Sequence, residues 1–328
     1  MPKIFSINLG NFGSTGRIVR GIGDSARLRG FETYFAYPDH SLNLPKNDND
    51  ICISSDITRR INAKLSFYTG YIGCFSWIST LRLIRKIKKI HPDIIHLHNI
   101  HDSYINHLLL FRYIKKNKIR VIWTLHDCWP FTGRCAYFSI LKCQKWKEGC
   151  HDCPMSKNIY PSAYVDKTKR MWNLKKKWFT GVENMTLVTP SEWLSRLVKE
   201  SYMKDYSVRV INNGIDLSAF KPTTSDFREK YGISEDEFIL LGVSFDWGER
   251  KGLDVFIKLS EMLDDSYKIV LLGTTDETDK YLPESIVSIH RTENQRELVE
   301  IYSACDLQKY IQQQTYLLIL QGKIIFQL

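Results

Sequence analysis

The sequence lacks the features that mark several classes of protein. It contains no uninterrupted apolar run of membrane-spanning length, no signal-peptide pattern ahead of a first strand that begins at Lys3, no internal repeat of solenoid length and no low-complexity segment. These absences argue against an integral membrane protein, a secreted protein and a repeat protein. We therefore expect a cytoplasmic protein that is soluble or lies peripherally on the inner face of the cytoplasmic membrane.

Two common nucleotide-binding motifs are also absent from the glycine-rich segment at 10–17. Its spacing is not Gly-x-Gly-x-x-Gly and no Walker lysine follows, so a dinucleotide or a nucleoside triphosphate is a poor candidate ligand. The segment follows a predicted strand and precedes a helical stretch. Its glycines permit a tight turn and a close approach of the backbone to a phosphate.

The chain has the length and composition of a globular protein with two domains. It has 328 residues, of which 43% are hydrophobic and 25% are charged. Short aliphatic runs alternate with helical stretches, which predicts parallel strands joined by crossover helices. The strands predicted for the first half lie at 4–8, 33–37, 94–98, 120–126 and 185–189, the last of which closes the first sheet, and a helix capped by Ser191 follows.

A new strand from Val208 begins the second half, so we place the domain boundary near residue 206. This predicts an α/β protein with two doubly wound domains, residues 1–206 and 207–328, that face each other across a cleft. Ligands of such sheets bind beyond the carboxyl ends of the strands. One such end is the run 239–245, which is followed by a polar turn with Arg250 and Lys251 and then a helix. The positive end of that helix and the two cations would bind a diphosphate, although an exposed Arg-Lys pair with no ligand fits the pattern equally well.

Several short motifs occur in one order along the chain. They lie at 208–216, 220–222, 227–233, 269–273 and 297–306. In this order they resemble the family 4 glycosyltransferases, and the resemblance covers residues 1 to about 306. It implies the GT-B fold, with two Rossmann-like domains, and the transfer of a sugar from a nucleoside-diphosphate sugar with retention at the anomeric carbon.

The resemblance also implies roles for individual residues. His126, at a strand end, would be the catalytic residue beside the transferred sugar, although a lone strand-end histidine is more often structural. Donor binding is carried over to Gly13, Ser14, Thr15, Gly16, Arg250, Lys251 and Gly273, and the acceptor side to His98, Asn99 and His101. Catalysis in this fold needs no metal ion, because cations of the protein and helix ends replace one.

Five cysteines lie close together in an insertion at 128–153. In a reducing compartment the four thiols of Cys135, Cys143, Cys150 and Cys153 suggest a structural zinc site more than disulfides. Buried free thiols remain an alternative, because the spacing is not that of twin Cys-x2-Cys motifs.

The formal net charge of +10 requires an anionic partner to be considered. The segments 81–90 and 167–179 combine basic residues with apolar ones, so each could lie on an anionic membrane surface. Each is equally an ordinary amphipathic helix with a solvated basic face. A basic, zinc-containing nucleic-acid-binding protein would explain the charge and the thiols, but not the two-domain alternation of strands and helices.

The segment 308–328 contains no Asp or Glu, whereas family members carry a Glu-x7-Glu motif there. We expect this segment to result from a truncation or frame shift that leaves the second domain incomplete and impairs activity; the alternatives are a natural short form or a non-catalytic remnant. The expected function is the transfer of a hexose from a nucleoside-diphosphate sugar to a lipid-linked or oligosaccharide acceptor in surface polysaccharide biosynthesis. We expect no nucleic-acid partner.

Overall fold

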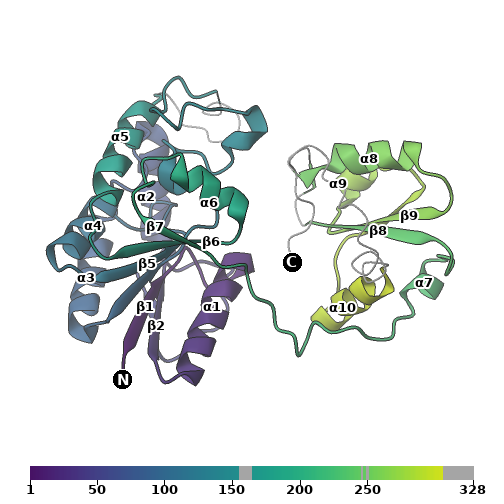
Figure 1. Ribbon diagram of the computed structural model, residues 1–328, viewed down its shortest axis with the longest axis horizontal. Coiled ribbons are helices and arrows are strands. Elements are labelled where there is room, and N and C mark those ends of the chain that lie inside the picture. Colours follow the sequence, from purple (N-terminus) through teal and green to yellow (C-terminus); the bar gives the residue numbers. More distant parts are fainter. Residues whose placement is uncertain (155–164, 245–246, 249–250, 306–328) are drawn as a thin grey trace. The chain divides into compact units, whose positions relative to one another are not determined.

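The chain divides into two units, and each is an α/β structure with a parallel sheet (Figure 1). The computed structural model describes residues 1–154, 165–244, 247–248 and 251–305. We call Met1–Gly214 the N-terminal unit and Ile215–Leu328 the C-terminal unit. The predicted α/β class with Rossmann-like units is confirmed.

Seven parallel strands form the sheet of the N-terminal unit. In spatial order they are β3 (Asp50–Cys52), β2 (Glu32–Tyr37), β1 (Lys3–Ile7), β4 (Ile94–Leu97), β5 (Arg120–Thr124), β6 (Met185–Thr189) and β7 (Ser207–Val210). The chain runs from β1 toward one edge and from β4 toward the other. The topological switch therefore lies between β1 and β4, which is where ligands bind in open α/β sheets.

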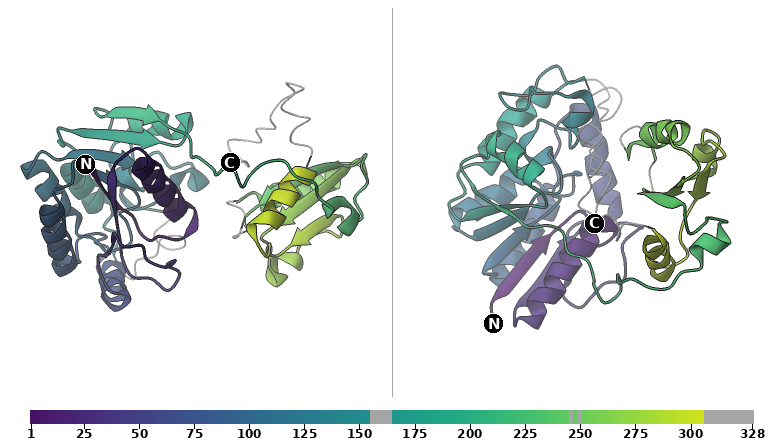
Figure 2. Two further views of the ribbon diagram at one scale, coloured as in Figure 1. Left: turned by 90° about the horizontal axis from the view of Figure 1, so that it is seen from below. Right: turned by 45° about the vertical axis from the view of Figure 1, so that its right-hand side comes forward.

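Helices cover both faces of this sheet (Figure 2). They are α1 (Gly13–Leu28), α2 (Asp56–Thr69), α3 (Trp77–Ile90), α4 (His107–Lys116), α5 (Thr168–Phe179) and α6 (Glu192–Lys199), with short 3-10 turns at Trp129–Phe131 and Phe138–Leu141. Helices α3, α4 and α5 pack side by side, whereas α1 packs on β2. The strands read as continuous apolar runs because both faces are covered. Phe5, Ile95 and Trp123 are fully buried.

The C-terminal unit contains a smaller sheet in the order β10-β9-β8, again parallel. Its elements are α7 (Phe227–Lys230), β8 (Phe238–Val243), α8 (Leu253–Met262), β9 (Tyr267–Leu272), α9 (Asp276–Asp279), β10 (Ile286–Ile289) and α10 (Gln295–Ala304). Alternate residues of β9 enter two separate cores. Ile269 and Leu271 pack with Phe256 of α8, while Val270 belongs to the core that contains Ile301 of α10.

The structure corrects the predicted end of the first sheet. The strand expected to open the second domain is β7, which pairs with β6 in parallel register, with Ser207 opposite Thr186. The crossover through α6 returns the chain to the same sheet, so the first unit ends at Gly214 instead of residue 206. The short edge strand β3 was not predicted. The predicted cap of α6 is confirmed, because Ser191 Oγ accepts a hydrogen bond from the Leu194 N–H at 3.3 Å.

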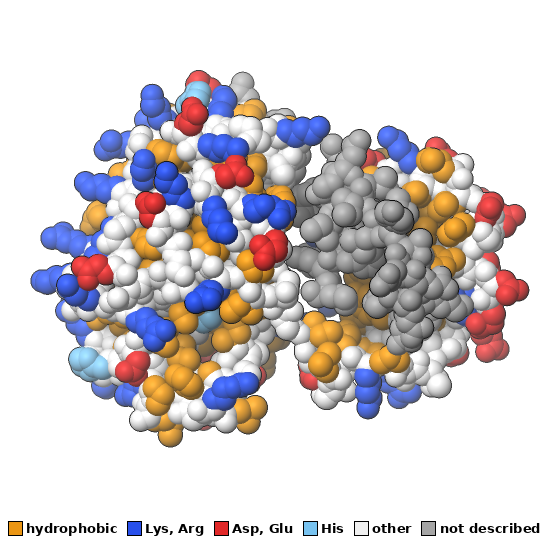
Figure 3. Space-filling view, viewed as in Figure 1, with side chains coloured by type: hydrophobic (Ala, Val, Ile, Leu, Met, Phe, Trp, Pro, Cys, Tyr) orange, Lys and Arg blue, Asp and Glu red, His pale blue; other side chains and the backbone are white. Residues whose placement is uncertain are grey.

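Basic side chains are prominent on the surface of the N-terminal unit, and acidic ones are fewer on the face that Figure 3 shows. None of the helices in the described ranges is long and apolar enough to cross a membrane.

Candidate active site

Three histidines lie in a row at the carboxyl ends of β4 and β5. His98 Nδ1 is 3.1 Å from His126 Nε2, and the ring centroids of His96 and His98 are 4.1 Å apart. His96 Nε2 in turn lies 2.9 Å from Thr124 Oγ1. Strands β4 and β5 are parallel, and His96 lies opposite Ile122 in their register. Alternate side chains along a strand point to the same face, so His96 and His98 meet Thr124 and His126 across the pair. The structure thus brings the predicted catalytic residue His126 into contact with the predicted acceptor-side residue His98.

Burial keeps these imidazoles neutral. It lowers the pKa of His96 and of His126 to about 4, and it lowers the pKa of His98 well below the ordinary value. His98 is 2% exposed, whereas His126 is only half-buried. At neutral pH, His126 is therefore a hydrogen-bonding group and not an acid.

The direction of the His98–His126 hydrogen bond follows from the second nitrogen of His98. Its Nε2 atom is buried and has no hydrogen-bond partner among the described residues. A buried N–H without an acceptor is rarer than an unpaired lone pair, so we assign the proton of His98 to Nδ1, which donates to His126 Nε2. The proton of His126 is then on Nδ1, which makes it a donor for a ligand.

Asn8 connects the loop after β1 to the loop after β4. Its side chain is fully buried; Nδ2 donates to the Gly10 carbonyl at 2.8 Å, and Oδ1 accepts from the Asn99 N–H at 3.1 Å. Asn99, predicted on the acceptor side, therefore lies beside the glycine-rich loop. Sequence analysis did not single out Asn8, although a polar residue at the end of a buried strand was a usable signal.

His101 lies beside the carboxylate that follows His126. His101 Nε2 is 3.4 Å from Asp127 Oδ2, and Asp127 Oδ1 accepts from the Trp129 N–H at 2.8 Å. Burial alone would raise the pKa of Asp127, but His101 and the Trp129 N–H together hold that pKa below its ordinary value. A buried anion therefore stands next to the histidine row, and sequence analysis missed this pairing.

The predicted donor residues Gly13, Ser14, Thr15 and Gly16 form the first turn of α1. Gly13 has φ +65°, a left-handed conformation that glycine adopts without strain. Gly13 and Ser14 are exposed, and no side-chain hydrogen bond from the N-cap residue Phe12 caps the start of this helix, as an anion site at its N-terminus would require. Gly16 has no room for a side chain, because a Cβ there would lie 2.5 Å from the Asn11 carbonyl carbon.

In the C-terminal unit, Gly273 follows β9 directly, and Lys251 lies between the neighbouring strand β8 and helix α8. Lys251 precedes α8, and its N–H donates to the Gly248 carbonyl at 2.9 Å. Gly273 follows β9 with φ +87°, and its N–H donates to the Ile289 carbonyl at 2.7 Å. Arg250, predicted as the partner of Lys251, lies outside the described residues.

The four predicted zinc ligands, Cys135, Cys143, Cys150 and Cys153, line one small cavity of about 20 Å³. The Gly133 N–H donates to Cys150 Sγ at 3.1 Å. Burial raises the pKa of the Cys150 thiol, while the Gly133 N–H and the charge of the fully buried Lys175 act to lower it. Within the described ranges, no three His, Cys, Asp or Glu side chains are arranged so that they could hold a metal ion as they stand. The zinc site therefore stays a prediction.

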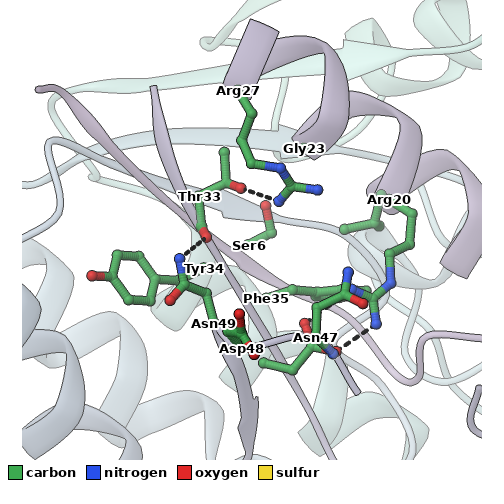
Figure 4. Close-up of a pocket in the computed structure, with 12 residues that line it drawn as sticks. Ser6, Arg20, Gly23, Arg27, Thr33, Tyr34, Phe35, Asn47, Asp48 and Asn49 are labelled. Atoms are coloured by element: carbon green, nitrogen blue, oxygen red, sulfur yellow. Dashed lines mark hydrogen bonds and ion pairs between the residues drawn. The ribbon is translucent and has the colours of Figure 1, made fainter. Parts of the chain in front are cut away.

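A pocket of about 200 Å³ opens between α1 and the strands β2 and β3 (Figure 4). Its cations already have partners: Arg20 donates to Asp50 at 3.0 Å, and Arg27 donates to Thr33 Oγ1 at 2.6 Å. None of the predicted site residues lines it. We therefore place the candidate active site at the histidine row.

Residues 15–219, more than half of the chain, match the family model described as Glycosyltransferase Family 4. The chain belongs to glycosyltransferase family 4.

Two relatives of this family 4 chain show how much of a longer protein it covers. It is 31% identical over 134 residues to WcaC of Escherichia coli K12, which is named as a glycosyl transferase of colanic acid biosynthesis; the match covers 39% of this chain and 32% of WcaC. It is 26% identical over 301 residues to a glycogen synthase of Streptococcus agalactiae serotype III, covering 75% of this chain and 60% of that protein. The chain thus spans less than two thirds of either relative.

Solved structures of similar fold confirm the GT-B architecture. Sucrose-phosphate synthase from Thermosynechococcus elongatus gives a TM-score of 0.56 at 15% identity, covering 93% of this chain and 74% of that one. Anabaena HepE in complex with UDP-glucose gives 0.53 at 12% identity, with 93% and 72% covered. At these identities the likeness concerns the fold alone.

Proposed function

We propose that this chain transfers a hexose from a nucleoside-diphosphate sugar to a lipid-linked or oligosaccharide acceptor, with retention, in the synthesis of a surface polysaccharide. Membership of glycosyltransferase family 4 supports the transfer reaction. The name of WcaC supports the polysaccharide, and the complex of HepE with UDP-glucose supports the class of donor.

The observation that carries the proposal is the neutral, half-buried His126 at the carboxyl end of β5. Its Nε2 accepts a hydrogen bond from His98, so the ring proton is on Nδ1, and in this proposal that N–H donates to the ligand. A neutral imidazole can donate this proton into a hydrogen bond with a sugar hydroxyl and remain uncharged throughout the reaction. His126 would then orient the bound sugar without protonating the donor, and so without promoting hydrolysis of the bond between the sugar and the diphosphate.

The departing nucleoside diphosphate requires positive charge as the bond to the sugar breaks. Lys251 and the start of α8, both in the C-terminal unit, would supply it. In this proposal the protein's own cations and helix ends do the work that a metal ion does in other transferases.

The test is transfer from radiolabelled uridine- and guanosine-diphosphate sugars to lipid extracts and oligosaccharides. We expect a labelled product whose rate of formation falls by about two orders of magnitude in His126→Ala. His126→Asn, whose amide can donate from nearly the position of Nδ1, should retain much more activity. Equal rates in the wild type and His126→Ala would refute the role of His126.

Donor binding is measured separately, by titration calorimetry with uridine and guanosine diphosphates. Lys251→Ala should weaken the binding of the preferred nucleotide by about tenfold or more, the loss of one charge-assisted contact. Lys268→Ala, which removes a cation from β9 itself, is the matched control. If both variants bind as the wild type does, Lys251 has no part in the donor site.

A further inference from the structure

An apolar stripe lies on the outer face of α2, where a helix of a globular protein ordinarily presents polar side chains. Ile57, Ile61, Leu65 and Tyr68 recur at helical spacing and are 71%, 55%, 42% and 53% exposed. We call these four side chains the α2 face. A contiguous apolar stripe on an exposed helix marks an interaction surface.

The opposite side of α2 is polar, and it attaches the helix to the N-terminal unit. Asn62 and Ser66 are buried; Asn62 Nδ2 donates to Ser76 Oγ at 2.8 Å, and Ser66 Oγ lies 2.7 Å from Ser103 Oγ. Turning the helix over would break these buried hydrogen bonds and leave their partners unsatisfied. The amphipathic character of α2 is therefore inverted, and its apolar side is held outward.

Positive charge accompanies the α2 face. Arg60 and Lys64 are exposed on the same helix. Its one acidic residue, Asp56, is already paired, because Arg59 approaches it at 2.7 Å and Arg60 at 2.6 Å. The surface of α2 thus combines apolar side chains with an excess of cations, the composition of helices that lie on anionic bilayers.

The start of α3 continues this composition. Trp77 and Ile78 follow Ser76 directly and are 52% and 67% exposed. Exposed Arg82 and Arg85 follow on α3, which has no acidic residue. Tryptophan and tyrosine are enriched at the level of lipid head groups, so Trp77 and Tyr68 both fit such a surface.

The sequence suggested two other segments, 81–90 and 167–179, as membrane surfaces. The structure shows that apolar residues of both segments are buried in the core. In α3, Leu83 and Ile87 belong to the main core, and in α5 so do Met171 and Trp178. The apolar sides of the segments 81–90 and 167–179 are therefore buried in the protein and do not face a membrane. Among the described residues, nothing covers the α2 face in this way.

We propose that the α2 face docks on an anionic lipid bilayer. Ile57, Ile61 and Leu65 enter the boundary between head groups and acyl chains, while Lys64 meets the lipid phosphates. Helix α2 also contacts the loop after β4, where Arg59 lies 3.3 Å from Asp102. Docking would then hold the acceptor-side loop near the bilayer. The benefit of this position for catalysis rests on the proposed lipid-linked acceptor.

Flotation of the 328-residue chain with vesicles, in the absence of any donor, tests the docking alone. We expect binding to vesicles of phosphatidylcholine and phosphatidylglycerol in equal parts, weaker binding to phosphatidylcholine alone, and loss of binding as salt is raised. Ile57→Ser combined with Ile61→Ser should lower the partition coefficient by about tenfold or more. Lys64→Glu should weaken binding to the anionic vesicles only.

The matched control is Leu28→Ser, which removes an 89% exposed leucine from the end of α1 and should leave binding unchanged. All four replaced side chains are exposed, so thermal melts by circular dichroism should match that of the wild type. The proposal is overturned if the wild type does not float with anionic vesicles, or if the double variant and Leu28→Ser bind alike. If the wild type sediments as a dimer and the double variant as a monomer, the α2 face contacts a second copy of the chain instead.

Discussion

The stability of the N-terminal unit should fall as the pH falls from 7 to 4, and His107 offers a direct measure of this effect. His107 begins α4, is fully buried, and lies 2.8 Å from the Ile100 carbonyl through Nε2. Its Nδ1 is buried, and no residue in the described ranges forms a hydrogen bond with it. Burial lowers the pKa of His107 to about 3, because a second proton on the ring would occupy an apolar site with no acceptor.

The sign and size of the effect follow from proton linkage. In the unfolded chain the imidazole has a pKa of about 6.5, so it binds a proton on unfolding wherever the pH lies between about 3 and 6.5. Stability therefore rises with pH across this range and is fully present above 7. At pH 5.5 the unfolded ring is about nine-tenths protonated, which corresponds to about 1.2 kcal/mol per pH unit. Relative to pH 8, the loss from this one residue at pH 5 is about 2 kcal/mol.

Urea unfolding at a series of pH values, followed by tryptophan fluorescence, measures this slope. Trp247 is the only tryptophan of the C-terminal unit, so the signal reports mainly the N-terminal unit. His107→Gln will reduce stability at every pH through lost packing, but it should also lower the slope near pH 5.5 by about 0.9 proton. An unchanged slope in His107→Gln would refute the reasoning.

Two further substitutions test the packing of α1 and the cysteine cluster. Gly16→Ala should destabilise the fold by about 1–3 kcal/mol in urea unfolding, because its Cβ would meet the Asn11 backbone, whereas Gly23→Ala on the same helix meets only ordinary contact at 3.8 Å and should be tolerated. Protein purified without chelator should contain about one zinc ion per chain by elemental analysis, and Cys150→Ser should lower that content while Cys52→Ser does not. Metal-free wild-type protein would exclude the zinc site.

The sequence was sufficient to predict most of the first sheet, because its strands are buried on both faces and read as uninterrupted aliphatic runs. It failed at β7, whose Ser207–Val210 has alternating exposed and half-buried residues and resembles the start of any new sheet. The partner of such a strand is decided by the crossover through α6, which periodicity does not encode.

The candidate site was predictable to a similar extent. Strand-end positions identified His98 and His126, since the carboxyl ends of parallel strands share one edge. Their contact depends on the register of β4 against β5, which places side chains diagonally across the pair. Register is a tertiary property, and so is the burial that makes both rings neutral. The sequence therefore predicted the two residues, but it did not predict their hydrogen bond or their protonation state.

The helices give the clearest case of what a pattern leaves undetermined. A period of 3.6 residues shows that a helix has an apolar side, but not whether the protein or something else covers that side. In α3 the apolar residues Leu83 and Ile87 are buried in the core. In α2 the buried residues are Asn62 and Ser66, which hydrogen-bond to Ser76 and Ser103, while Ile61 is exposed. A helix that polar contacts hold in place leaves its apolar side available to another surface, and docking on a bilayer would bury that side.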